Sequence, residues 1–467
     1  MTKSSAPFHL SGPELETWRL LARGALSIIS LTHRASGFWA YPPIKEEVDQ
    51  YYKGSNEMAF SSTEYGSYTV TWIALLALQH LSIKCPTCYL NKVEHGFDNN
   101  PAIGGARGRP LGGRTKAKAV DASARHTAFA SLTLSQFLPE HQRVDLLASV
   151  RWLLKNQNPS THGWKYRPTD SEDEAFSTAA CIAALAVFMS RYASILPSET
   201  IGASNPEIHK SNQEMVGAIK IAIANGLQRL FDMKSKEGLW KGHLNEPNDL
   251  IGTANIIDLI SSPEVGEAIP LVNRIDLTAK IADVKAALIM LRRHYGWPIN
   301  YDSPEPSISA TIHVLFTLYD TLLNDKNDVT HLNLRGIAKY IAEETTEKGG
   351  ALRLDSWDWP MLGRLCATLL STTEGRILSE SEVSQSLAAI EILKRSGSRV
   401  VQLCVLSHYA FLKPWYPTIL FVLSKGQPLW WHRAFLTFFG FAKFLPMLKK
   451  LLEKYVEKAI EHQLGIT

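Results

Sequence analysis

Between two apolar runs of the chain stands the sequence Asn156-Gln-Asn-Pro-Ser-Thr-His-Gly163-Trp164-Lys-Tyr166. The preceding run, residues 144–154, has the periodicity of a helix, and Pro159 and Gly163 favour a turn where it ends. The following run, residues 179–189, is apolar on every side, as expected for a helix that is buried all round. The segment is therefore predicted to be a helix, a Gly-Trp turn and a second helix.

Related units recur along the chain. Good copies of the Gly-aromatic turn lie at 37–39, 163–164, 238–240 and 296–297, and degenerate copies at 112–114 and 349–351. Alignment of the Thr-Ala type positions on 69, 127, 178, 253, 309 and 367 gives spacings of 58, 51, 75, 56 and 58 residues, with a polar insertion at 197–212 in the longest. Nothing between these turns has the alternation of a β-strand.

One helix of each unit is amphipathic and the other is apolar all round. The pattern predicts an all-α fold, an (α/α)6 toroid with an outer and an inner ring of helices. We expect a tether at 1–14, the toroid at 15–410 and a C-terminal helical extension at 411–467. Two toroids built from shorter repeats are the alternative.

Composition narrows the function classes. The 49 basic and 45 acidic residues give a formal net charge of +4, which is too balanced to predict binding to nucleic acid. Five cysteines are an odd number for a disulfide framework and suit a reducing compartment. The first ten residues do not have the pattern of a secretory signal, so a cytoplasmic protein is expected, peripheral to a membrane if the tail binds one.

The turn from Gln157 to Trp164 resembles the QW repeat of the squalene cyclase and protein prenyltransferase superfamily, and the resemblance covers about residues 15–410. It implies a terpenoid cyclase-like or prenyltransferase-like protein that binds an isoprenoid or another apolar ligand in a central cavity. In the cyclases of this superfamily an acid triplet precedes one Thr-Ala pair and protonates the substrate. Here Ser123-Ala-Arg125-His126 stands at that position, so the resemblance implies a divergent member without the acid motif.

The prenyltransferases of the superfamily also hold one zinc ion through Asp, Cys and His. The local candidate in this chain is Cys85-x-x-Cys88 with His95, and its alternative is a loop with two free thiols. No cofactor is clearly implied.

Acidic residues recur just before the inner helices, where they either cap a helix or rim the mouth of a cavity. If the protein is an enzyme, the acid and base candidates are Asp121, His126, Glu172, Asp173 and Glu174. The ligand-binding candidates are Arg125, Asp249, Asp355 and Asp358, together with Arg107, Arg109, Arg114 and Lys116 in a glycine-rich loop that either cradles a diphosphate or is solvated.

Aromatic and basic residues dominate the segment 411–452. They predict an interfacial helix that contacts a membrane surface, or else a closing element packed on the toroid.

Two further functions of the whole protein remain open. One is a non-catalytic toroid that serves as a scaffold for a protein partner. The other is an (α/α)6 polysaccharide lyase, which would need a Tyr or His base with Arg and aromatic stacking in an open groove.

Overall fold

The computed structural model describes residues 11–33, 37–39, 67–81, 87–99, 123–138, 143–192, 206–241, 249–324, 328–346, 354, 357–371, 377–396 and 399–423. Over these ranges the chain is helical and has no β-strand, although isolated bridges occur, such as the one between His33 and Trp39. The prediction of an all-α fold is confirmed.

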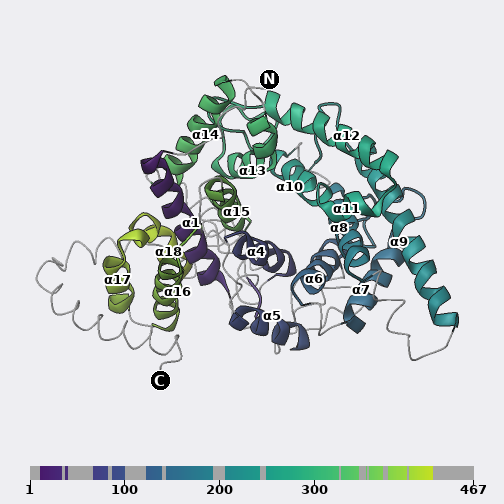
Figure 1. The fold of residues 1–467 in the computed structure, drawn as a ribbon, viewed down its shortest axis with the longest axis horizontal. Helices are drawn as coiled ribbons and strands as arrows, with labels where there is room; N and C mark the ends of the chain where they lie inside the picture. Colours follow the sequence, from purple (N-terminus) through teal and green to yellow (C-terminus); the bar gives the residue numbers. More distant parts are fainter. Residues whose placement is uncertain are drawn as a thin grey trace, which may run out of the picture.

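Six apolar helices of the described chain contact one another in cyclic order (Figure 1). In that order they are α4 (Tyr68–His80), α6 (Ala124–Phe137), α8 (Ala175–Tyr192), α10 (Leu250–Ile260), α13 (Ile308–Asn324) and α15 (Asp358–Ser371), and α15 contacts α4. These are called the inner helices below. In α8 every position except Ser190 and Arg191 is buried, as its run of apolar residues predicts.

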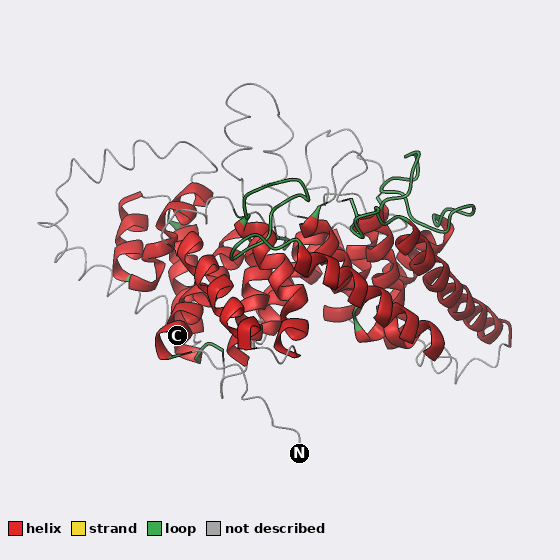
Figure 2. Ribbon diagram, turned by 90° about the horizontal axis from the view of Figure 1, so that it is seen from above, coloured by secondary structure: helices red, strands yellow, loops and turns green. Residues whose placement is uncertain are grey.

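A second set of helices lies outside the inner ones (Figure 1). It comprises α1 (Gly12–Thr32), α5 (Thr87–Asn99), α7 (Arg143–Lys155), α9 (Pro206–Asp232), α12 (Leu271–Met290) and α14 (Asp328–Thr346), and a short α11 (Pro263–Ala268) precedes α12. The outer helices are amphipathic: α12 buries only Leu277, Val284 and Leu288, which share one helical face. Most of the described loops lie on one side of the helical layer (Figure 2).

A tryptophan joint connects the outer and the inner helix of a unit. The backbone N–H of Trp240 donates to Oγ1 of Thr253 at 3.1 Å, and its indole Nε1 donates to the carbonyl oxygen of Leu230 at 2.7 Å. Its own carbonyl oxygen accepts from the N–H of Asp249, which begins the inner helix, at 3.2 Å. The same bonds recur for Trp39 with Thr71 and Ile29, for Trp164 with Thr178 and Leu153, and for Trp297 with Thr311 and Leu288.

The joints correct the register of the predicted repeat. The hydroxyl that bonds to tryptophan in the first unit belongs to Thr71, and the one in the fifth unit to Thr311. The alignment on positions 69 and 309 is therefore wrong by two residues. The inner helices are rich in small residues, so pairs that resemble Thr-Ala occur at more than one position in a helix. Only the residue four positions after the N-cap residue faces the turn and bonds to its tryptophan.

Side chains cross the space that the inner helices enclose. Trp357, directly before α15, lies 5.7 Å between ring centres from Phe129 of α6 and 5.7 Å from Phe176 of α8. Arg364 of α15 makes two bonds to Asp258 of α10, at 2.6 and 3.0 Å. Neither α6, α8 nor α10 neighbours α15 in the cyclic order, so these contacts span the interior.

The described end of the chain packs against α1. It consists of α16 (Glu380–Arg395), α17 (Arg399–His408), the 3-10 helix η2 (Ala410–Trp415) and α18 (Tyr416–Leu423). Trp415 is fully buried, and its ring centre is 5.7 Å from that of Trp359 in α15. Within 411–452 this packing agrees with the closing-element alternative as far as Leu423, and the rest of that segment lies outside the described residues.

One described helix, α8, is long and apolar enough to cross a membrane. Its 18 residues include Arg191, and 89% of them are buried inside the fold. Its apolar character is therefore accounted for by its contacts with other helices.

Candidate functional site

Two predicted site residues lie in the first turn of the inner helix α6. Ser123 caps this helix by accepting a hydrogen bond from the N–H of His126 at 3.5 Å. Arg125 and His126 are both half-buried. The positive end of the helix dipole coincides with their position, and it favours an anionic group there.

Glu174, the residue before α8, holds Arg125 in place. Nη2 of Arg125 donates to one carboxylate oxygen of Glu174, and the hydroxyl of Ser177 donates to the other. The guanidinium carbon lies 4.7 Å from the ring centre of Phe176 and 5.0 Å from that of Tyr166. The ion pair and the two cation–π contacts together restrict the planar guanidinium to one orientation.

The ring of Tyr166 contacts a second arginine, Arg167, as well as Arg125. The N–H of Ala124 donates to the carbonyl oxygen of Tyr166 at 3.0 Å, so Tyr166 lies at the start of α6. Its ring centre is 5.8 Å from that of His126 and 5.7 Å from the guanidinium carbon of Arg167. We call Arg125, His126, Tyr166, Arg167 and Glu174 the arginine cluster.

The cluster contains two buried donors that lack an acceptor within the described chain, Nε of Arg125 and Nε of Arg167. A buried donor left without a partner costs about 1–3 kcal/mol, and more when the group is charged. Both of these donors lie beside the ring of one tyrosine, Tyr166.

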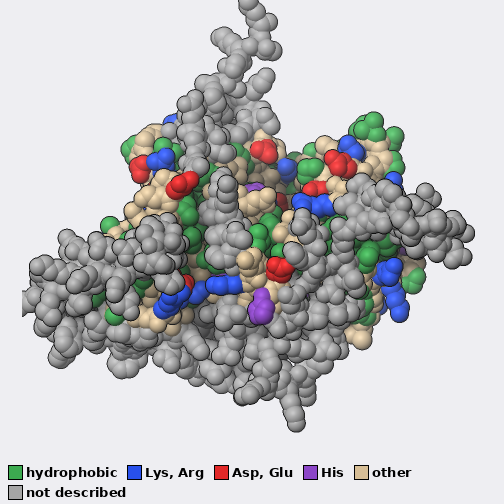
Figure 3. Space-filling view, turned by 60° about the horizontal axis from the view of Figure 1, so that its bottom comes forward, with side chains coloured by type: hydrophobic (Ala, Val, Ile, Leu, Met, Phe, Trp, Pro, Cys, Tyr) green, Lys and Arg blue, Asp and Glu red, His purple; other side chains and the backbone are tan. Residues whose placement is uncertain are grey.

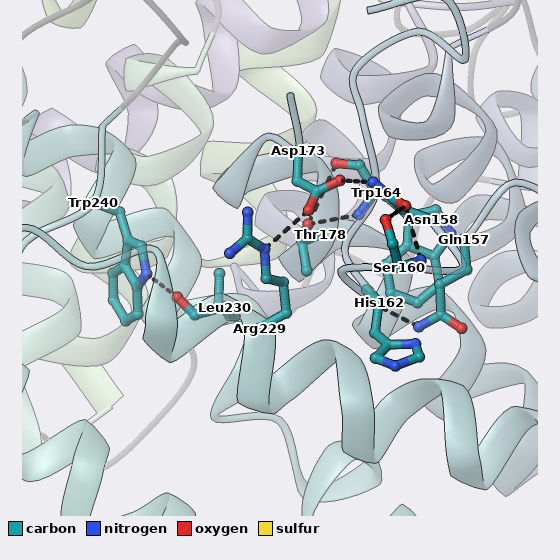
Figure 4. A network of polar contacts seen from close by, with 10 residues as sticks. All are labelled: Gln157, Asn158, Ser160, His162, Trp164, Asp173, Thr178, Arg229, Leu230 and Trp240. Atoms are coloured by element: carbon teal, nitrogen blue, oxygen red, sulfur yellow. Dashed lines mark hydrogen bonds and ion pairs between the residues drawn. The ribbon is translucent and has the colours of Figure 1, made fainter. Parts of the chain in front are cut away.

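A polar cleft lies beside the loop that carries Glu174. Next to that residue, the buried carboxylate of Asp173 accepts from Nε of Arg229 at 2.9 Å and from the amide of Asn158 at 3.1 Å (Figure 4). Gly163 makes room for it, because a Cβ there would lie 2.7 Å from Cγ of Asp173. The cleft has a volume of about 430 Å³, and its polar lining includes Asn158, Thr161, Glu172, Arg229, Asp232 and Lys241.

The predicted acid and base candidates have different surroundings. Asp173 and Glu174 are buried in ion pairs with arginine, whereas Glu172 is exposed at the polar cleft. His126 belongs to the arginine cluster. Asp121 lies outside the described residues.

The predicted ligand-binding residues are dispersed. Arg125 joins the arginine cluster, while Asp249 caps α10 by accepting from the N–H of Ile251 at 2.8 Å. Asp358 is buried, accepts from the hydroxyl of Ser309 at 2.5 Å and faces Nε2 of His313 at 3.0 Å. The candidates Asp355, Arg107, Arg109, Arg114 and Lys116 lie outside the described residues.

The described residues contain no group of three or more His, Cys, Asp or Glu side chains that could hold a metal ion. Neither Cys85 nor the side chain of Cys88 is described, so the zinc prediction is not tested. Cys181 is buried, and burial, assisted by the nearby carboxylate of Glu174, raises the pKa of its thiol. A thiol that stays protonated is a poor nucleophile, and Cys181 is therefore a packing residue.

Sequence reasoning missed Tyr166, Arg167 and Arg229 as site residues. A signal for the first existed, because Tyr166 follows the joint tryptophan Trp164 by two positions. Ile299 follows Trp297 by the same interval, and its carbonyl oxygen likewise accepts from the first N–H of an inner helix, that of Leu250, at 3.2 Å. The repeat itself thus places the second residue after the tryptophan at the start of the preceding inner helix.

Charges of both signs are interspersed on the face shown in Figure 3, where Lys and Arg side chains lie among Asp and Glu side chains of the described chain. This distribution agrees with the balanced composition of the sequence.

No family model matches the chain, and no curated protein matches it. Among solved structures, three that are titled as a glycosidase align with 78% of this chain and 99% of their own chains. One is the wild type and two carry single substitutions; each is 12% identical to this chain, with TM-scores of 0.46 and 0.47. Likeness at this level carries no argument about function.

These findings overturn the resemblance to the terpenoid cyclase and prenyltransferase superfamily. The similar structures are glycosidases, and no family model or curated protein supports a terpenoid relationship. The predicted membership is wrong, and these comparisons give no support to isoprenoid, lipid or membrane association. The physical reason lies in the Gly-Trp turn: its tryptophan bonds to two helices and buries its ring, which serves helix packing and specifies no substrate.

Proposed function

We propose that the inner and outer helices form an (α/α)6 toroid and that the protein cleaves an acidic polysaccharide by β-elimination at the arginine cluster. The observation that carries this proposal is the pair of buried, unmet Nε donors on Arg125 and Arg167, two arginines that both contact the ring of Tyr166. The planar guanidinium group matches the geometry of a carboxylate, and acidic sugars present a carboxylate on the ring.

The chemistry follows from this placement. With the sugar carboxylate held by Arg125 and Arg167, the adjacent carbon loses its proton to His126. The electron pair of that C–H bond forms a carbon–carbon double bond as the bond to the glycosidic oxygen breaks. Tyr166 donates a proton to the leaving oxygen, and its ring lies 5.8 Å from His126.

The arginines have a second role in this reaction. Removal of the proton places additional negative charge on the sugar carboxylate, and the guanidinium groups of Arg125 and Arg167 stabilise that charge where it develops. Glu174 is a positioning residue, because it touches Arg125 and holds the guanidinium between Tyr166 and Phe176.

The test is incubation of the full chain with a panel of acidic and neutral polysaccharides, followed by ultraviolet absorbance of the unsaturated product. Arg125→Gln and Arg167→Gln are expected to lower the rate roughly 100-fold or more, the effect of removing a transition-state donor. Arg151→Gln on α7, an exposed arginine outside the cluster, is the matched control and should keep full activity. Absence of unsaturated product from every acidic polysaccharide rules the proposal out.

A non-catalytic scaffold is the second candidate. It is favoured by the contacts of Trp357 with Phe129 and Phe176 and by the bonds from Arg364 to Asp258, because these side chains occupy the interior in which a ligand would bind. In that case the protein would bind a protein partner, and Arg125→Gln would leave its binding unchanged.

A further inference from the structure

The polar cleft and the arginine cluster share one residue. Glu174 bonds to Arg125 in the cluster and also lines the cleft. Its neighbour Asp173 is bound by Arg229 at the cleft wall. Because Glu174 belongs to both, the arginine cluster and the cleft lie next to each other.

The lining of the cleft determines what it can bind. Glu172, Asp232 and Lys241 are exposed at the cleft, and Arg229 uses Nε for Asp173. The cleft therefore carries both acidic and basic side chains, and neither charge predominates strongly enough to favour a simple anion or cation. Ala175 and Met233 are apolar members of the lining, and they stand among charged, amide and hydroxyl side chains such as that of Thr161, so the cleft suits a ligand with both polar and apolar surface.

Alternating donors and acceptors fit a ligand that carries many hydroxyl groups. The volume of about 430 Å³ lies within the range of about 300–1,000 Å³ that is usual for small-molecule sites. We propose that the cleft binds a neutral sugar unit of the same polysaccharide whose acidic sugar binds in the arginine cluster. This inference rests on the proposed function and names its substrate class: a heteropolysaccharide in which an acidic sugar is linked to a neutral one.

The experiment compares two ligands by calorimetric titration of the full chain. One is a mixed oligosaccharide of acidic and neutral sugars, and the other is the acidic monosaccharide alone. The double variant Asp232→Ala/Lys241→Ala removes two exposed cleft side chains of opposite charge. Because two hydrogen bonds are lost, we expect its affinity for the mixed oligosaccharide to fall about fivefold or more, with unchanged affinity for the monosaccharide.

A matched control exists on α12. Asp276→Ala/Lys280→Ala removes a pair of the same charges, an exposed aspartate and a half-buried lysine, which form an ion pair at 2.9 Å and do not line the cleft. It should bind both ligands as the unmodified protein does. If the cleft variant binds the mixed oligosaccharide as tightly as the control does, or loses affinity for both ligands equally, the inference is wrong.

Failure of the proposed function gives a different result. If no polysaccharide is cleaved but the cleft variant still loses affinity for the mixed oligosaccharide alone, cleavage is refuted and the sugar-binding cleft stands. If cleavage occurs and the cleft variant cleaves homopolymers and heteropolymers in the same ratio as the control, the cleft is refuted and the cleavage stands.

Discussion

Arg125 of α6 and Glu174, which precedes α8, form an ion pair that joins two neighbouring inner helices. The carboxylate side is almost completely buried, at 2% exposure, whereas the guanidinium is 19% exposed. Removal of one charge leaves the other in a poorly solvated place, which is the main cost of breaking such a pair.

Glu174→Gln is accordingly expected to lower the free energy of unfolding by about 2 kcal/mol, because the half-buried guanidinium of Arg125 loses its counter-charge. Glu172→Gln, two residues away and exposed, should change it by less than about 0.5 kcal/mol. Denaturant titrations of both variants provide the measurement. Equal midpoints for the two would show that the ion pair contributes nothing.

The tryptophan joint predicts an effect that depends on one hydroxyl. Thr253→Val keeps the shape of the side chain and leaves the backbone N–H of Trp240 buried without its acceptor, at a cost of about 1–3 kcal/mol. The control is Thr133→Val, because the equally buried hydroxyl of Thr133 bonds only to the carbonyl oxygen of Phe129 in its own helix. Thermal unfolding should separate the midpoints of the two variants by about 1–2 °C, because a chain of this length shifts by about 1 °C per kcal/mol. A smaller loss for Thr253→Val than for Thr133→Val would contradict the joint.

Gly24 predicts how the end of the described chain docks. A Cβ at this position of α1 would collide with the indole of Trp415, so Gly24→Ala should cost about 1–3 kcal/mol and loosen η2 from α1. Gly217→Ala in α9 meets no atom within 4 Å and should stabilise the protein by about 0.5–1 kcal/mol through helix propensity. Limited proteolysis of the segment after α17 reports the docking, and equal cleavage of both variants would refute this account.

His80 predicts a dependence of stability on pH. Burial first, and then the charge of Arg364, lower its pKa from 6.5 to about 4, against an opposing effect of Asp258. Between these values the unfolded chain binds a proton that the folded chain does not, so stability is lost as the pH falls from 6.5 to 4. The loss is up to about 3 kcal/mol.

His80→Gln removes this titration, and its stability should fall less over the same pH range. The measurement is the free energy of unfolding from denaturant titrations at about pH 7, 5.5 and 4, which span the interval between the two pKa values, about 4 and 6.5. Parallel stability curves for the two proteins would show that His80 does not carry the effect.

The helical fold and its repeat could be predicted from the sequence, because each joint needs a glycine-containing turn, a tryptophan and an apolar helix, and all three are visible in the sequence. The sequence was insufficient for the register. Thr69 and Thr71 both precede apolar residues of α4, and only the bond to the N–H of Trp39 distinguishes them. That bond depends on the angle at which the turn meets the helix, which periodicity does not encode.

The candidate site was predictable in part. Arg125 and His126 stood out because an arginine and a histidine begin an otherwise apolar helix. Glu174 and Arg125 are 49 residues apart in the chain, and the packing of α6 on α8 brings them together. No local sequence pattern specifies this ion pair. The sequence predicts Asp173 as an acid of the site, but its packing against Gly163 and its ion pair with Arg229 of α9 depend on the fold and have no local signal.

The cyclic order of the inner helices has one boundary that no chain connection crosses, that between α15 and α4. The first helix, α1, contacts both sides of this boundary. It packs along α15, and Trp39, whose indole bonds to Ile29 of α1, also bonds to Thr71 of α4. α1 thus acts as a bridge across the single boundary between neighbouring inner helices that the chain itself leaves unconnected.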